Sequence, residues 1–92
     1  MPRIAIEDFG EQEIARIYLA ARFAEAQLVE EALNRHGVEF AVEVEAYRGS
    51  VLLWYSEHKG AAFYVRANQA EHCGDLLRGA GLTAGLLETE FQ

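Results

Sequence analysis

The sequence of 92 residues is poor in the features that mark several classes of protein. It has one cysteine and one proline, and no apolar run approaches the roughly 20 residues of a membrane-spanning helix. A single cysteine cannot form an internal disulfide bond, so we expect a reducing, cytoplasmic environment. Residues 1–13 lack the long apolar region of a secretion signal, because the acidic residues Glu7 and Asp8 interrupt the apolar sequence.

Basic side chains are also scarce. Eight lysine and arginine residues stand against fifteen aspartate and glutamate residues, which gives a formal net charge of −7. An acidic chain repels phosphate backbones and anionic lipid headgroups, so its charge argues against nucleic acid and membrane surfaces as partners. Hydrophobic residues make up 51% of the chain, as in globular proteins, and the length suits one domain with one core.

Periodicity in the first half predicts a strand, a helix and a second strand. Residues 14–22 alternate as in a strand, and residues 24–36 then repeat apolar side chains every three or four positions, as in a helix. Gly37 follows the helix directly, as expected of a residue that tolerates positive φ. From residue 38 on, apolar and acidic side chains alternate, which predicts the second strand.

Two stretches with the composition of turns follow this strand. Residues 48–50 and 57–60 flank the apolar run "VLLWY" at 51–55, and "AAFYV" at 61–65 reads as the third strand. We therefore expect an extra hairpin limb between the second and third strands.

A second helix and a short final strand complete the pattern. Asn68 is a good N-cap, and Glu71 stands three positions later, as in a capping box. Residues 82–90 supply the final strand. The order is strand, helix, strand, strand, helix, strand.

This order predicts an α+β fold, the ferredoxin-like βαββαβ sandwich, in which two helices cover one face of an antiparallel sheet. Right-handed crossovers place the second strand at an edge. We expect residues 1–13 to form an N-terminal arm and residues 14–92 the single domain. The helix-covered face is predicted to carry Ile17, Leu19, Val38, Phe40, Val42, Val44, Phe63 and Val65, and the open face Arg16, Tyr18, Tyr64 and Arg66.

Residues 16–82 resemble a family of small bacterial domains of unknown function, described as prokaryotic signal-transducing proteins and placed near the P-II (GlnB-like) ferredoxin-like fold. The matching stretches are "RIYLAARFAEAQLVEEALNRHGVEFAVEVE" and "FYVRANQAEHCGDLLRGAGL". The resemblance implies the fold, because each matching stretch is a signature of fold more than of chemistry. Family members often carry a shorter connection, rich in glycine or proline, where this chain has "VLLWYSEHKGA". No nucleotide-binding motif of P-II proteins is visible, so none of their residues is transferred.

Three carboxylates line one side of the second strand: Glu39, Glu43 and Glu45. A flat row converges poorly on calcium or magnesium, which need oxygen ligands from several directions. A solvated sheet face also lacks the desolvation that raises the pKa of a catalytic acid. We interpret the row as a device that keeps an edge strand from uncontrolled pairing, and as a candidate docking strip. Arg16 and Arg66 could meet some of these carboxylates.

Metal and phosphate sites are weakly supported. His72 and Cys73 are adjacent on a helix and point about 100° apart, so they do not easily share one ion with His58. Cys73 falls in the apolar stripe of its helix, where a thiol behaves as a small hydrophobic group. The glycines of "GAGLTAG" at 79–85 follow a helix and do not precede one, unlike a phosphate-binding loop. We predict neither a metal nor a cofactor.

Exposed aromatic residues are more informative. Tyr18, Tyr64 and Tyr47 are predicted on the open face, and residues 52–55 crowd two leucines, Trp54 and a tyrosine together. RNA-recognition folds stack bases on aromatics of such a face, but the basic surroundings they need are absent here. Two interpretations remain: the limb packs against another subunit or protein, or Trp54 folds over its own core.

The sequence therefore predicts a non-enzymatic interaction or regulatory module that forms a dimer or trimer, or binds another protein. No set of nucleophile, base and orienting group can be assembled. The alternative is a small-ligand sensor that holds a metabolite or nucleotide between subunits, with Arg48 and Lys59 as anion anchors. The candidate residues for binding a partner or a second copy are Tyr18, Glu43, Glu45, Leu53, Trp54, Tyr55 and Tyr64.

Overall fold

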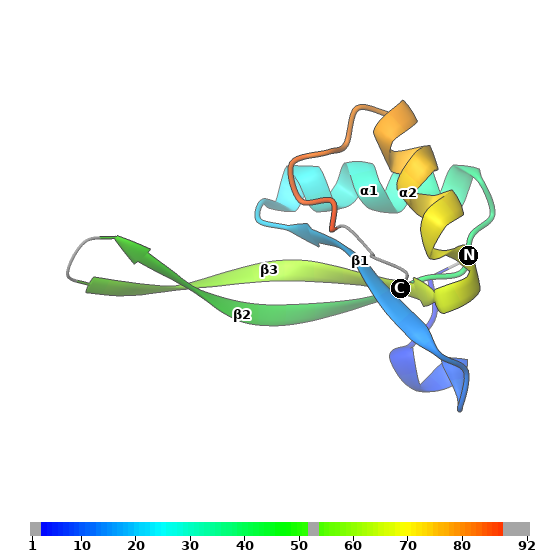
Figure 1. Ribbon diagram of the computed structural model, residues 1–92, viewed down its shortest axis with the longest axis horizontal. Coiled ribbons are helices and arrows are strands. Elements are labelled where there is room, and N and C mark those ends of the chain that lie inside the picture. Colours follow the sequence, from blue (N-terminus) through cyan, green and yellow to red (C-terminus); the bar gives the residue numbers. More distant parts are fainter. Residues whose placement is uncertain (1–2, 52–53, 88–92) are drawn as a thin grey trace.

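The computed structural model describes residues 3–51 and 54–87, with the backbone alone described at 45–51 and 54–59. The chain has a mixed α+β fold, in which two helices cover one face of a three-stranded antiparallel sheet of order β1-β3-β2 (Figure 1). The elements are the 3-10 helix η1 (Ile6–Phe9), β1 (Ile14–Ala20), α1 (Phe23–Arg35), β2 (Ala41–Val51), β3 (Trp54–Arg66), the 3-10 turn η2 (Ala67–Gln69) and α2 (Ala70–Gly79).

The helices follow the predicted periodicity closely. α1 lies within one residue of its predicted bounds, and Gly37 just beyond it has a φ of 68°. The start of α2 differs from the prediction, because η2 precedes it and Gln69 is its N-cap, without a side-chain cap bond. The predicted cap at Asn68 is wrong, since that residue lies inside the 3-10 turn.

β2 and β3 form one long hairpin, so the two predicted turns are wrong. Residues 48–50 and 57–60 lie inside the strands, where Arg48 pairs with Glu57 and Gly49 with Ser56. Continuous pairing satisfies the backbone N–H and C=O groups that the two strands direct at each other, which outweighs the turn preference of a few residues. The run at 51–55 is therefore not a separate limb: Val51 ends β2 and Trp54 begins β3.

A bulge in β1 overturns the predicted position of Tyr18. Arg16 pairs with Tyr64, but the next pair along β1 joins Tyr18 to Phe63, so Ile17 is an extra residue. One inserted residue moves every following side chain to the other face of a strand. Tyr18 therefore lies under the helices, 0% exposed, and is unavailable to a partner on the open face.

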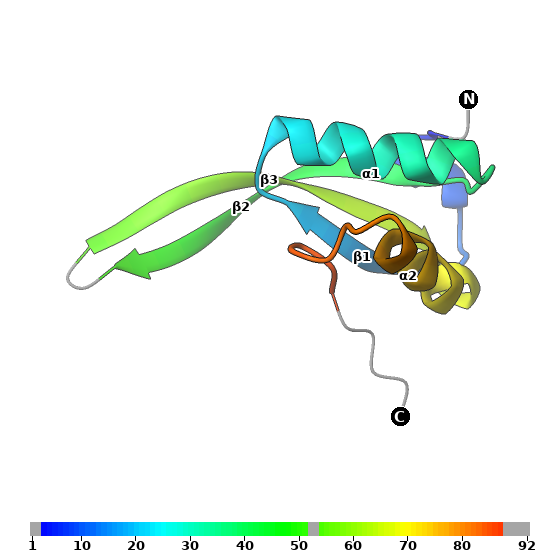
Figure 2. The ribbon, with the colours of Figure 1, turned by 90° about the horizontal axis from the view of Figure 1, so that it is seen from above.

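Most of the predicted core is confirmed. Ile17, Val38, Phe40, Phe63 and Val65 are buried in one cluster with residues of both helices. Val42 is half-buried against this cluster. The prediction for Leu19 is wrong, because the bulge places its half-buried side chain on the face opposite that of Tyr18. Val44 contradicts the prediction, because it is 73% exposed. The helices cover only the part of the hairpin next to β1, and the hairpin then runs beyond them (Figure 2).

The segment after α2 returns to the free side of β1. Leu19 N–H donates to the Gly85 carbonyl and Leu87 N–H to the Ile17 carbonyl, each at 2.9 Å. The predicted strand at 82–90 is reduced, within the described residues, to a single bridge between Tyr18 and Leu86. Gly85 is required there, since an added Cβ would stand 2.1 Å from the Leu19 carbonyl oxygen. The rest of the predicted strand lies outside the described residues.

The N-terminal arm wraps around the β2 side of the sheet. Arg3 forms a parallel bridge with Phe40, and Ile4 N–H donates to the Phe40 carbonyl at 2.8 Å. The chain then passes to the face opposite the helices, where η1 lies (Figures 1 and 2). Phe9 at the end of η1 is 3% exposed, so the arm is packed onto the domain.

Candidate interaction surface

The far part of the β2–β3 hairpin is a two-stranded ribbon. β1 pairs with β3 only from Ala61 to Arg66, whereas β2 pairs with β3 from Trp54 to Tyr64. Among the described residues, the pairs from Glu45–Gly60 to Val51–Trp54 thus have no third strand. We call residues 45–51 and 54–60 the ribbon. It projects away from both helices (Figures 1 and 2) and gives the molecule a long axis of 43 Å against 30 Å for the other two.

The outer edge of β2 is a second part of this surface. β3 occupies one side of β2 over the full length of the strand. On the other side, within residues 3–51 and 54–87, the chain supplies one bridge, from Arg3 to Phe40, just before the strand begins. An edge of this length exposes backbone donors and acceptors on which another strand can pair.

Most of the predicted binding residues fall on the ribbon or beside it. Glu43 is exposed in β2, and Tyr64 is half-buried in β3, opposite Ala41. Leu53 lies outside the described residues, and Tyr18 is in the core. The backbone positions of the remaining candidates belong to the ribbon: Glu45 and Arg48 in β2, and Trp54, Tyr55 and Lys59 in β3.

Three exposed apolar side chains were not predicted: Phe23 at 78%, Val44 at 73% and Leu28 at 53% exposed. Phe23 stands seven positions before Glu30 and so shares its face of α1. Glu30 lies 3.7 Å from Arg3, which is bridged to the end of the β2 edge. The flank of α1 that carries Phe23 therefore borders this edge. The helical pattern alone could not reveal it, because exposure here depends on where the sheet ends.

A groove of about 500 Å³ separates the N-terminal arm from the start of β2. Ile4, Ile6 and Val42 are half-buried around it, with charged side chains beside them. The sequence contained a signal for it, since the alternating "RIAI" of the arm suggests a segment that lies along an edge. The groove is lined by Arg3, Ile4, Ala5, Ile6, Glu7, Val42 and Glu43.

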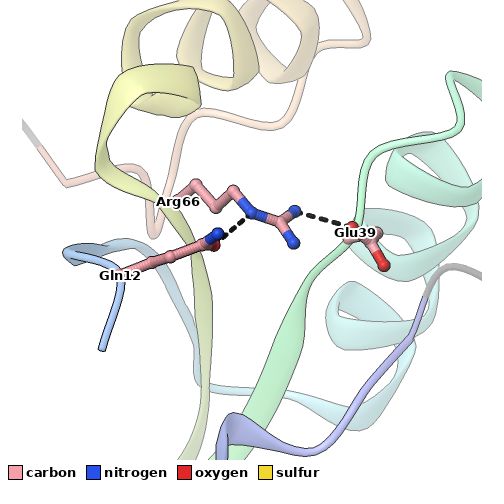
Figure 3. Close-up of polar contacts among 3 residues, drawn as sticks. All are labelled: Gln12, Glu39 and Arg66. Carbon is pink, nitrogen blue, oxygen red and sulfur yellow. Dashed lines mark hydrogen bonds and ion pairs between the residues drawn. The ribbon is translucent and has the colours of Figure 1, made fainter. Parts of the chain in front are cut away.

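Arg66 fixes the arm to the sheet (Figure 3). Its Nε–H donates to Gln12 Oε1 at 2.5 Å, and its Nη1 lies 2.7 Å from Glu39 Oε1. Its guanidinium carbon stands 5.3 Å from the centre of the Phe9 ring. The prediction that Arg66 meets one of the carboxylates is confirmed. Glu39 is thus engaged within the chain, whereas Glu43 is exposed in β2.

Tyr18 and Cys73 are titratable residues of the core, and both have structural roles. The Tyr18 hydroxyl donates to Glu25 Oε2 at 2.6 Å, and burial, together with this bond, raises the pKa of the phenol. Glu25 Oε1 also accepts from the Ala21 N–H at 3.2 Å, before the first turn of α1. Cys73 is fully buried, and burial raises the pKa of its thiol to about 11. The prediction that Cys73 packs as a small hydrophobic group is confirmed.

Comparisons of the chain with known protein families, with curated proteins and with solved structures find no match. Neither helix in the described part of the chain is long and apolar enough to span a membrane. The described side chains include no group of three or more histidine, cysteine, aspartate or glutamate residues that could hold a metal ion.

Proposed function

We propose that the protein is a non-enzymatic interaction and regulatory module that self-associates, as a dimer or trimer, through the ribbon and the outer edge of β2. The observation that carries this proposal is the two-stranded ribbon itself. Its seven pairs, Glu45–Gly60 to Val51–Trp54, span about 20 Å. A hairpin without a third strand or a packed face is only marginally stable in water. Pairing with another chain would therefore stabilise the ribbon.

The composition of the ribbon supports binding to protein. It joins aromatic and aliphatic residues, among them Tyr47, Val51 and Trp54, with two acidic and two basic residues. Apolar centres with a polar surround are typical of protein interfaces. Arg48 and Glu57 are opposite each other in the register of the two strands and carry opposite charges. We therefore expect the ribbon to bind a free anion only weakly.

We also propose that the fold is the ferredoxin-like sandwich of the P-II-like signal-transducing family. Residues 85–87 bond to the free side of β1, which extends the order of segments to 85–87, β1, β3, β2. This is the order expected for the split βαβ arrangement. A binding role fits the one thiol, because Cys73 is buried with a raised pKa and is a poor nucleophile. A single cysteine also fits the cytoplasm.

Sedimentation velocity from low to high micromolar concentration tests the proposal. The matched variant replaces residues 47–58 with Asn-Gly, which closes a two-residue hairpin on the retained pair Ala46–Lys59. We expect the unmodified chain to shift to a larger species as concentration rises, and the shortened chain to stay monomeric with unchanged helical circular dichroism. A chain that is monomeric throughout, or a shortened variant that associates equally well, would overturn the proposal.

A further inference from the structure

We propose that two copies of the chain pair through the outer edges of β2, antiparallel and centred on Ala46. This inference rests on the proposed self-association and names its partner and its geometry. β2 has 11 residues and is paired with β3 on one side. On its other side the described residues contribute only the bridge from Arg3 to Phe40. Among the described residues, the arm lies beside Val42 and Glu43 across the groove but forms no bridge to them. A second copy could therefore pair along the strand and join two sheets into one.

Symmetry limits the ways in which this edge can meet its own copy. A two-fold axis between two antiparallel strands stands perpendicular to the sheet, so each residue lies opposite one on the same face. If residue i of one copy lies opposite residue j of the other, the sum of i and j is the same for every pair. The sum is even, because two residues on the same face of the strand differ by an even number of positions. Each possible pairing is therefore defined by one central residue, which lies opposite its own copy.

The charges of the strand disfavour most centres. A centre at 43, 44 or 45 places glutamates opposite one another, as Glu43–Glu43, Glu43–Glu45 or Glu45–Glu45. Centres at 41 and 42 pair at most three positions of β2, because the strand begins at Ala41 and Phe40 is already bridged by the arm. A centre at 48 opposes two copies of Arg48. Like charges directly opposite each other destabilise a strand pair. Between residues 41 and 48, only centres at Ala46 and Tyr47 avoid like charges and still pair most of β2.

The length of the paired segment selects Ala46. With this centre, Ala41 lies opposite Val51 of the second copy, so β2 pairs over its full length. A centre at Tyr47 leaves Ala41 and Val42 outside the pairing. The smallest side chain in the middle of the strand then lies at the two-fold axis, where the two copies approach each other.

The N-terminal arm fits the same arrangement. The second copy's strand ends opposite Ala41, and the next position of the edge, Phe40, is already bridged by the arm. The groove between the arm and β2 lies at this point. Its half-buried Ile4, Ile6 and Val42 are suited to the apolar end of the arriving ribbon. Each copy would thus place its ribbon against the body of the other.

Cysteine cross-linking under mild oxidation tests the register in the full chain. In the proposed pairing, the Ala46 Cα atoms lie about 4.5–5.5 Å apart, within the range of a disulfide bond. The two copies of Val44 are offset by four positions, about 13 Å, and cannot be bridged. We expect Ala46→Cys to form a covalent dimer and Val44→Cys to remain monomeric. The native Cys73 is fully buried and adds no background.

A charge pair gives a second readout that needs no oxidation. The proposed register sets Glu45 opposite residue 47 of the second copy, twice by symmetry. Tyr47→Lys should tighten the dimer and Tyr47→Glu should weaken it, each changing the dissociation constant by about 2- to 30-fold. A centre at Tyr47 predicts the reverse for lysine, because two lysines would then face each other.

The outcomes separate the two proposals. A dimer by sedimentation that is cross-linked through Ala46→Cys, and tightened by Tyr47→Lys, supports the register. A dimer that Ala46→Cys does not cross-link, or that Tyr47→Lys weakens, overturns the register and leaves self-association standing. A chain that sediments as a monomer at every concentration overturns both.

Discussion

Replacing Arg66 with alanine should loosen the N-terminal arm and lower the free energy of unfolding. The side chain is 27% exposed and makes three contacts: with Glu39, with Gln12 and with the face of Phe9. A partly exposed ion pair contributes about 0.2–1 kcal/mol, and a hydrogen bond to a neutral acceptor about 0.5–1.5 kcal/mol. A cation–π interaction contributes about 0.5–1 kcal/mol. We therefore expect a loss of about 1–3 kcal/mol, measured by urea unfolding.

Arg78 offers a matched control on the same molecule. Its ion pair with Asp75 is 2.9 Å long, but both side chains are more than half exposed and are only three positions apart on α2. Arg78→Ala should therefore cost no more than about 0.5 kcal/mol. Arg66→Lys keeps the charge and loses the planar donors, so its loss of unfolding free energy should lie between those of Arg66→Ala and Arg78→Ala. If Arg66→Ala and Arg78→Ala destabilise the chain equally, Arg66 does not hold the arm.

Three further predictions concern the core. Tyr18→Phe removes the bond to Glu25 and should cost about 1–2 kcal/mol in urea unfolding. The pKa of Tyr18 is raised in the folded chain, so its contribution is complete below pH 10 and is lost as pH rises further; the phenylalanine variant should lack this alkaline loss. Cys73 is buried with a pKa of about 11, so iodoacetamide should modify it at pH 8 only after unfolding, and fast native labelling would contradict its burial. Gly85→Ala forces a Cβ to 2.1 Å from the Leu19 carbonyl and should lower thermal stability by about 1–3 kcal/mol, whereas unchanged stability would mean that the segment does not lie against β1.

Local patterns predicted the elements that depend on local physics. α1 was placed within one residue because its apolar repeat and Gly37 both mark its end. Val38 and Phe40 were assigned to the core because their alternation continues into a covered part of the sheet. Cys73 was assigned to the core from the stripe of its helix. In each case a short stretch of sequence contains the whole cause.

The wrong predictions concern residues whose position depends on segments that are distant in the sequence. The bulge at Ile17 depends on pairing with β3, and the sequence of β1 contains no signal for it. Tyr18 was therefore predicted on the wrong face. Val44 belongs to the same alternation as Phe40, but the helices end before they reach it. The ribbon was expected to break at residues 48–50, since turn composition is a local preference that a long antiparallel pairing can override.

The candidate surface was predicted in composition but not in shape. Glu43, Glu45 and Trp54 were selected for charge or aromatic character, and all three fall on the long hairpin. The exposed Phe23 was missed because its helix position is ordinary. The groove between the arm and β2 depends on the path of the arm around Phe40, which the sequence does not determine locally.

Residue-resolved amide hydrogen exchange at low and high protein concentration tests most directly whether another copy covers the edge of β2. We predict that alternate amides of Ala41–Val51, those directed away from β3, exchange more slowly as concentration rises. Amides of α2 and of β1 should not change. Exchange in β2 that is independent of concentration, in a sample that sedimentation shows to be associated, would contradict the account.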